Sequence, residues 1–149
     1  MKVWLVSVLV PCLLLVGGCG GATGSQGRAI QVSDAWARAV TAGANVNSAA
    51  YLTIRNTGQT ADRLVKATSD VATAVELHKT EMSGGVMKMA PMEGGIDLPA
   101  GGEMQLKPGG LHVMLIGVQR DLKAGEKITL KLQFEQAGET AVEVQVRNP

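Results

Sequence analysis

The feature that most constrains the fold of this chain is the alternation of apolar and polar residues near its C-terminal end. The segment "KITLKLQFEQAGETAVEVQV" alternates on both sides of a short polar turn at 136–138, which is typical of a β-hairpin. Earlier, "AYLTIRNTGQTADRLV" combines a strand, a turn at 56–58 and a second strand. Because a period of two puts apolar side chains on one face of an extended chain, these segments predict half-buried β-strands.

We expect short strands through most of the chain, near residues 29–39, 48–56, 61–68, 72–79, 85–90, 102–107, 111–119, 126–135 and 139–147. No segment has a sustained helical period with capping residues. Many short strands at close spacing predict an all-β fold, a β-sandwich with Greek-key connections. Neither a repeat nor a second domain is visible, so we expect one folded domain at residues 29–149.

The N-terminal segment is expected to be an export signal. One basic residue precedes a short apolar run that ends in small residues, and the run is too short for a comfortable membrane span. "LVGGC" resembles the lipobox of bacterial lipoproteins, which predicts a lipoprotein signal peptide at 1–18 and lipidation of Cys19. The alternative is a plain secretory signal cleaved near Gly21 or Ala22. Residues 19–28, rich in glycine, are expected to form a flexible tether.

Charge and cysteine content exclude several classes of partner and site. Cleavage before Cys19 removes Lys2 and leaves 13 basic and 13 acidic residues. No basic patch indicates a surface for nucleic acid or for lipid headgroups. Because Cys12 lies in the signal and Cys19 would carry lipid, we expect neither a disulfide framework nor a thiolate metal site in the domain.

The histidines and methionines of the mature chain are clustered. All eight lie within residues 78–114, where even scattering would place roughly two. A single methionine usually fills a core gap, and a lone histidine beside leucines is usually structural. The clustering therefore needs a reason beyond packing. The eight residues are His78, Met82, Met87, Met89, Met92, Met104, His112 and Met114.

The chemistry of these donors favours monovalent copper. Thioether sulfur and neutral imidazole nitrogen are the soft and borderline ligands that select Cu(I), whereas zinc and calcium prefer other donor sets. In an oxidising compartment they hold Cu(I) without an oxidisable thiolate. A blue-copper centre needs a cysteine sulfur, which the domain lacks. His112 and Met114, two apart in a predicted strand, place two donors on one face, about 7 Å apart along the strand.

The spacing of these residues closely resembles that of the PCuAC copper chaperones of bacterial periplasms. Ten residues separate His78 from Met89, and a His-x-Met motif at 112–114 follows after 22 residues, where the family has about 21. An extra glycine at Gly94–Gly95 explains the difference, since a turn can absorb it. The flanking segments "DAWARA", "NSAAYLTIRNTG", "DRLVKATSDVA" and "LKPGG" also resemble the family, so the resemblance covers about 30–149.

The resemblance implies a cupredoxin-like β-sandwich that is not an enzyme. It implies delivery of copper towards the CuA centre of cytochrome c oxidase, either to the CuA subunit itself or to an intermediary copper chaperone. The implied location is the periplasm, with membrane anchoring through lipidated Cys19, or soluble in the periplasm as the alternative. The implied ligands of one Cu(I) ion are His78, Met89, His112 and Met114.

Other methionines have less defined roles. Met87 lies two residues before Met89 on the same strand face, which makes it a candidate secondary metal ligand. Met82, Met92 and Met104 are expected at the rim of the site or in the core. Some PCuAC relatives carry a His/Met-rich C-terminal tail that adds Cu(II) capacity, whereas this chain ends in "VEVQVRNP", so we expect no such second site.

Three other functions stay open from the sequence. The first is passive copper storage or tolerance, which transfer to an acceptor would distinguish from chaperoning. The second is a β-sandwich scaffold lipoprotein that binds no metal, which metal analysis would test. The third is a hydrolytic or other enzyme that uses a histidine, although no Gly-x-Ser-x-Gly motif or similar nucleophile elbow supports it.

Overall fold

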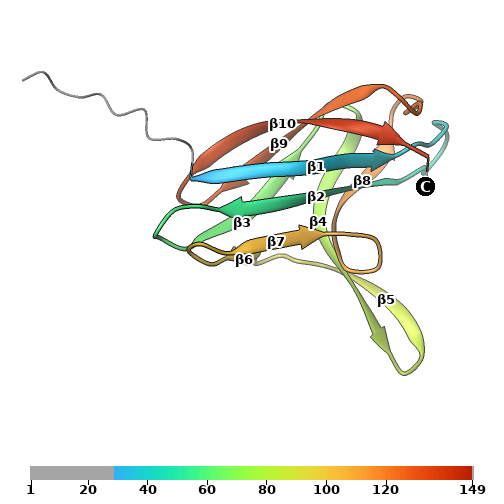
Figure 1. The fold of residues 1–149 in the computed structure, drawn as a ribbon. Coiled ribbons are helices and arrows are strands. Elements are labelled where there is room, and N and C mark those ends of the chain that lie inside the picture. Colours follow the sequence, from blue (N-terminus) through green and yellow to red (C-terminus); the bar gives the residue numbers. More distant parts are fainter. Residues whose placement is uncertain (1–28, 149) are drawn as a thin grey trace, which may run out of the picture.

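The computed structural model describes residues 29–148, and over that range it contains ten β-strands and no helix (Figure 1). The predicted all-β class is therefore confirmed. The strands are β1 (Ile30–Arg38), β2 (Ser48–Asn56), β3 (Asp62–Thr68), β4 (Ala72–Ser83), β5 (Val86–Pro91), β6 (Ile96–Leu98), β7 (Glu103–Leu106), β8 (Leu111–Val118), β9 (Lys127–Phe134) and β10 (Gly138–Arg147).

The strands form one continuous hydrogen-bonded strip that curls into a sandwich. Its order is β5-β4-β8-β2-β1-β10-β9-β3-β6, and β7 also pairs with β2. β10, β1, β2 and β7 lie towards the viewer in Figure 1, with β3 and β4 behind them. Strands far apart in the sequence, such as β2 and β8, become neighbours, and β1 runs parallel to β10. These crossovers are the Greek-key connections that the strand pattern predicted.

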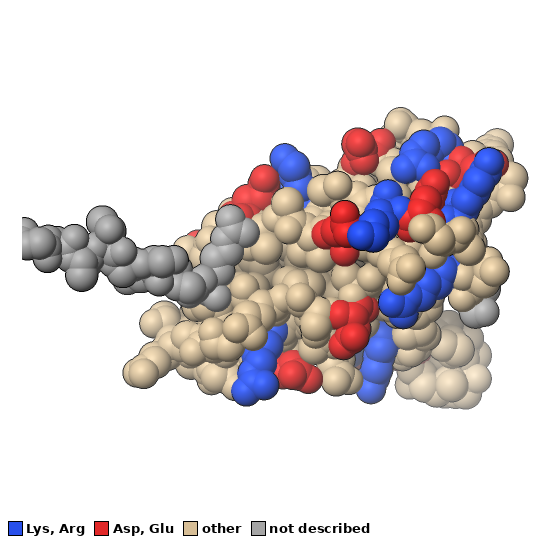
Figure 2. Space-filling model, turned by 45° about the horizontal axis from the view of Figure 1, so that its top comes forward, with Lys and Arg blue, Asp and Glu red and all other residues tan. Residues whose placement is uncertain are grey.

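The alternation seen in the sequence becomes alternate burial in the last hairpin. Leu130, Leu132 and Phe134 of β9 point into the core, and Val144 and Val146 of β10 join them. Residues between them are exposed or half-buried. On the face shown in Figure 2, basic and acidic side chains are interspersed, in keeping with the balanced charge of the chain.

The sequence prediction missed β6 and ended β4 too early. β6 has only three residues, too few to show a period, and it forms by pairing with β3. β4 continues to Ser83 because Gly84 and Gly85 both adopt positive φ angles, 59° and 79°. A turn with two such residues closes a tight hairpin directly onto β5. The β4–β5 hairpin therefore projects beyond the body of the sandwich (Figure 1).

The predicted signal peptide (1–18), the lipidated Cys19 and the tether (19–28) lie outside the described residues, as does residue 149. Within residues 29–148, no helix is long and apolar enough to cross a membrane. The lipobox prediction therefore stays a prediction.

Candidate metal centre

The two histidines lie opposite each other on neighbouring strands. β4 and β8 pair antiparallel, with His78 opposite His112 and Glu76 opposite Met114. Opposite residues of such a pair point to the same face of the sheet. The two imidazole centroids are 5.8 Å apart, with the ring planes at 55°. The structure thus adds a histidine from β4 to the His-x-Met pair of β8.

His112 is held in one tautomer by the backbone beside it. Its side chain is buried, with the residue only 3% exposed. Its Nδ1 lies 3.0 Å from the carbonyl oxygen of Gly110, so Nδ1 carries the proton and donates it. Nε2 is buried and has no hydrogen-bond partner among the described residues, so its lone pair is free.

His78 shows the same arrangement with its ring nitrogens exchanged. Its Nε2 donates a hydrogen bond to Oε2 of Glu76 at 2.8 Å. Its Nδ1 is buried and has no hydrogen-bond partner in the part of the chain that the structure describes. Glu76 lies two residues earlier on β4 and therefore faces the same side as His78.

Two unpartnered nitrogens in one pair of rings form an unusual combination. A buried polar group without a partner costs about 1–3 kcal/mol, so such groups are rare without a functional reason. Histidines that bind metal commonly donate their other N–H to a carbonyl or carboxylate, which fixes the ring and its tautomer. His112 with Gly110, and His78 with Glu76, both have this arrangement. The pair can therefore offer two imidazole lone pairs to one ion.

Two predicted thioethers lie beside this pair. A cavity of about 330 Å³ is lined by Met89, His112 and Met114 among others. Met114 is half-buried in β8, whereas Met89 in β5 is 53% exposed. His78 is not among the residues that line the cavity, and it joins the group through its contact with the His112 ring. The structure thus places all four predicted ligands in one region.

Aromatic side chains continue the same face away from the histidines. The Tyr51 ring centroid lies 6.4 Å from that of His112, and the Trp36 ring lies 4.6 Å from Tyr51. Both come from the layer of β1 and β2. Tyr51 also lines the cavity, so an aromatic ring borders the candidate site on that side.

The remaining methionines differ in burial. Met104 is buried in the core, and Met92 packs against the core while half-buried. Met82 and Met87 are strongly exposed, at 69% and 61%, on the β4–β5 hairpin. Met87 also lines the cavity, which keeps it a candidate secondary ligand.

Sequence reasoning missed the residues that orient the imidazoles. Glu76 precedes His78 by two residues, and Gly110 precedes His112 by two. For Glu76 that spacing is a signal, because residues two apart on a strand lie on one face, whereas the partner of His112 is a backbone carbonyl, which no residue type reveals. The extra residue expected at Gly94–Gly95 does fall in a turn, where the amide of Gly95 donates to the carbonyl of Met92.

Known proteins match this chain over most of its length. The family described as "Putative lipoprotein LpqE-like" matches residues 30–146. The "Putative lipoprotein Lxx21020" of Leifsonia xyli subsp. xyli (strain CTCB07) is 34% identical over 140 residues, which cover 94% of this chain and 82% of that protein.

Solved structures also match this chain. The "Copper-bound PCuAC domain from PmoF2" matches with a TM-score of 0.67 at 26% identity, covering 81% of this chain and 94% of that one. "CuI-DR1885 from Deinococcus Radiodurans" matches with a TM-score of 0.59 at 30% identity, covering 85% of each chain. The matches confirm the predicted sandwich and the resemblance to PCuAC proteins. The chain therefore belongs to the LpqE-like family, and its folded part is a PCuAC-type domain.

Proposed function

We propose that the domain binds one Cu(I) ion as cargo. The ligands are Nδ1 of His78, Nε2 of His112 and the sulfurs of Met89 and Met114. The observation that carries the proposal is the pair of buried, unpartnered imidazole nitrogens on facing strands. Copper in two structures of the same fold, one of them named for Cu(I), supports the choice of metal.

The ligand set explains why monovalent copper is preferred. Two neutral imidazoles and two thioethers are soft or borderline donors, which suit Cu(I) better than Zn(II) or Cu(II). The imidazoles are fixed by strand pairing and by their second hydrogen bonds. Met89 is half exposed, so its sulfur closes the site from the solvent side. A ligand from an acceptor protein can approach from that side and replace it.

We further propose that the bound copper is delivered towards the CuA centre of cytochrome c oxidase, directly to the CuA subunit or through an intermediary chaperone. The protein acts in the periplasm, anchored to the membrane through lipid on Cys19. The signal sequence with its "LVGGC" motif and the lipoprotein description of the family support this location. Passive storage is the competing function of the same site, because a storage protein keeps its copper when offered an acceptor.

Competition for Cu(I) with a chromophoric chelator, without oxygen, tests the ligands. Met114→Leu keeps volume and apolarity and removes only the sulfur, so it should weaken binding while changing stability by less than about 1.5 kcal/mol. His112→Ala should also weaken binding. Met92→Leu, at another half-buried methionine, is the matched control and should bind like the parent. Full affinity in both Met114→Leu and His112→Ala would refute the site.

Two further measurements test the metal and its destination. X-ray absorption of the loaded domain should show two nitrogen and two sulfur neighbours around copper. Mixing the loaded domain with an apo CuA domain should move copper to the acceptor. Retention of copper with an acceptor of higher affinity would favour storage, and a purified domain that takes up no Cu(I) would favour a scaffold protein.

A further inference from the structure

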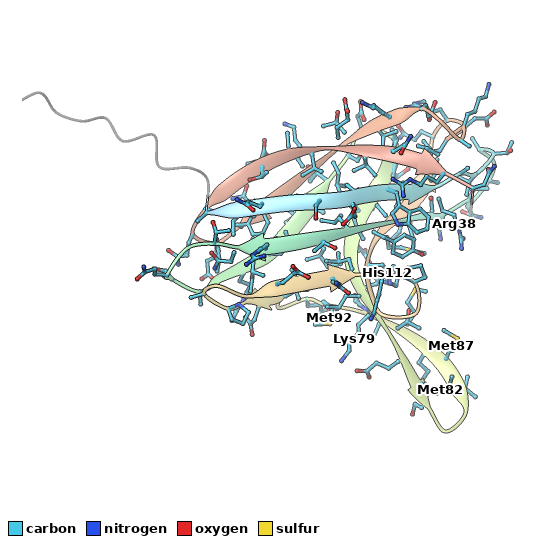
Figure 3. All side chains as sticks on the ribbon, in the orientation of Figure 1. Arg38, Lys79, Met82, Met87, Met92 and His112 are labelled. Carbon is cyan, nitrogen blue, oxygen red and sulfur yellow. The ribbon has the colours of Figure 1, made fainter. Side chains whose placement is uncertain are left out.

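The hairpin between β4 and β5 exposes three methionines beyond the body of the domain. Their exposed fractions are 69% for Met82, 61% for Met87 and 53% for Met89. Figure 3 shows Met82 and Met87 on the projecting hairpin, with His112 nearer the body. Single apolar side chains are common on protein surfaces, but a group of large ones marks a site of interaction.

Strand register places the three sulfurs on one face. Met82 lies directly opposite Met87, and Met89 follows two residues further along β5. Opposite Cβ atoms in such a pair are about 4.5–5.5 Å apart, and residues two apart on one strand are about 7 Å apart. His78 lies on the same face of β4 as Met82, four residues earlier. The three thioethers thus lead from the hairpin tip to the histidine pair.

We propose that Met82, Met87 and Met89 form a second Cu(I) site, the thioether site, which receives the ion before it reaches the histidines. The proposal rests on the function proposed above, because it takes the histidine pair as the destination. Thioethers are soft, neutral donors, and the flexible methionine side chain lets three sulfurs turn towards one ion. Without an imidazole ligand, and open to water, this site is the weaker of the two.

Met89 links the two sites, because it belongs to both ligand sets. Copper moves by ligand exchange while the Met89 sulfur stays bound. The bonds from copper to the sulfurs of Met82 and Met87 break as bonds to the two imidazole nitrogens and to Met114 form. All these donors are neutral, so the ion remains Cu(I) and neither an electron nor a proton is transferred.

A purely structural role for the hairpin methionines makes a different prediction. Packing between strands needs only apolar side chains of the right size. Met82→Leu and Met87→Leu keep size and apolarity and remove the sulfurs. The double variant therefore separates copper chemistry from hairpin packing. Met92→Leu with Met104→Leu is the matched control, since it removes two sulfurs that pack in or against the core.

Stopped-flow mixing with the Cu(I)–acetonitrile complex, without oxygen, tests the route. The Met82→Leu/Met87→Leu variant should load copper at least about tenfold more slowly than the parent, since even outer-shell changes at metal sites have effects of this size. The Met82→Leu single variant, whose residue does not line the cavity beside His112, should keep the parental final affinity at the histidine site. The control variant should load at the parental rate. A hairpin variant that loads as fast as the parent would overturn the proposal.

A second measurement observes the thioether site itself. In a His112→Ala/Met114→Leu background, Cu(I) should shift the methyl NMR signals of Met82, Met87 and Met89, and adding the two hairpin substitutions should abolish the effect. No shift in that background would overturn the thioether site and leave the proposed function intact. A different pair of results would overturn the proposed function instead. Those results are hairpin NMR shifts on adding Cu(I), together with a Cu(I) affinity that His112→Ala leaves at the parental value.

Discussion

Replacement of Glu76 tests whether the carboxylate beside His78 prepares that ring for metal. Oε2 of Glu76 accepts a hydrogen bond from Nε2 of His78 at 2.8 Å, which leaves Nδ1 as the buried lone pair. In Glu76→Ala the ring loses this partner and can rotate or change tautomer. Part of the population then no longer presents Nδ1 to the ion, and Cu(I) affinity falls.

The size of the effect follows from the position of the carboxylate. Outer-shell changes at metal sites cost about 10- to 100-fold in affinity. The Glu76 side chain is 48% exposed, so water replaces part of the interaction, and we expect a loss near tenfold, about 1.4 kcal/mol. Glu76→Gln keeps a carbonyl oxygen as acceptor and should lose less. The free energy of unfolding should change by less than about 1 kcal/mol, because the Glu76 carboxylate is half exposed and pairs near the surface contribute little to stability.

Chelator competition without oxygen measures the affinities, and ¹⁵N NMR of the imidazole reports the tautomer of His78. Glu81→Ala is the matched control, since Glu81 lies on the same strand, forms an ion pair with Lys79 and faces the other side of the sheet. It should bind copper like the parent. Parental affinity in Glu76→Ala, together with an unchanged tautomer, would refute the orienting role of Glu76.

Three further predictions concern the fold and the anchor. Gly95→Ala should destabilise the domain by more than about 1 kcal/mol in urea unfolding, because φ of Gly95 is +75° and an added Cβ would lie 2.6 Å from a backbone carbonyl oxygen of β3. Gly94→Ala is the control and should be nearly neutral, because a Cβ added there meets open space. Asp62→Ala should lower the free energy of unfolding by about 1–3 kcal/mol, because the Asp62 carboxylate accepts three backbone N–H bonds, two of them from the β9–β10 turn. Asp97→Ala, at an exposed carboxylate, is the control. Equal urea midpoints for the two variants would contradict the prediction. Cys19→Ser should move the protein from the membrane to the soluble fraction, and membrane retention of that variant would argue against lipid anchoring.

Most strands could be predicted because their burial is one-sided. In β9, and in β10 from Val142 onwards, each apolar residue alternates with a polar one, and the structure buries or half-buries the apolar set. The β4–β5 hairpin was harder, because β5 is exposed along its whole length and so has no burial pattern to reveal its pairing. Two glycines at the turn, Gly84 and Gly85, set its length instead.

The site was predicted as a set of residues but not as a geometry. Spacing identified His78 and His112, yet only the register of β4 against β8 makes them direct neighbours. Register depends on contacts between segments more than 30 residues apart, and no local pattern carries it. The free nitrogens depend in turn on partners that sequence reasoning passed over, Glu76 and the carbonyl of Gly110.

The proposed Cu(I) ligands lie on different strands, and this division affects how copper would be transferred to an acceptor. His78 and His112 belong to paired strands at the body of the sheet, and hydrogen bonds fix both rings, so little conformational entropy is lost when they bind an ion. Met89 belongs to an exposed edge strand and has a flexible side chain, so in the proposed site its bond to copper would be the one most easily replaced. Under the proposed function, affinity depends mainly on β4 and β8, and exchange depends on β5. A carrier needs both properties at once, because it must hold Cu(I) tightly between encounters and still release it when an acceptor ligand arrives.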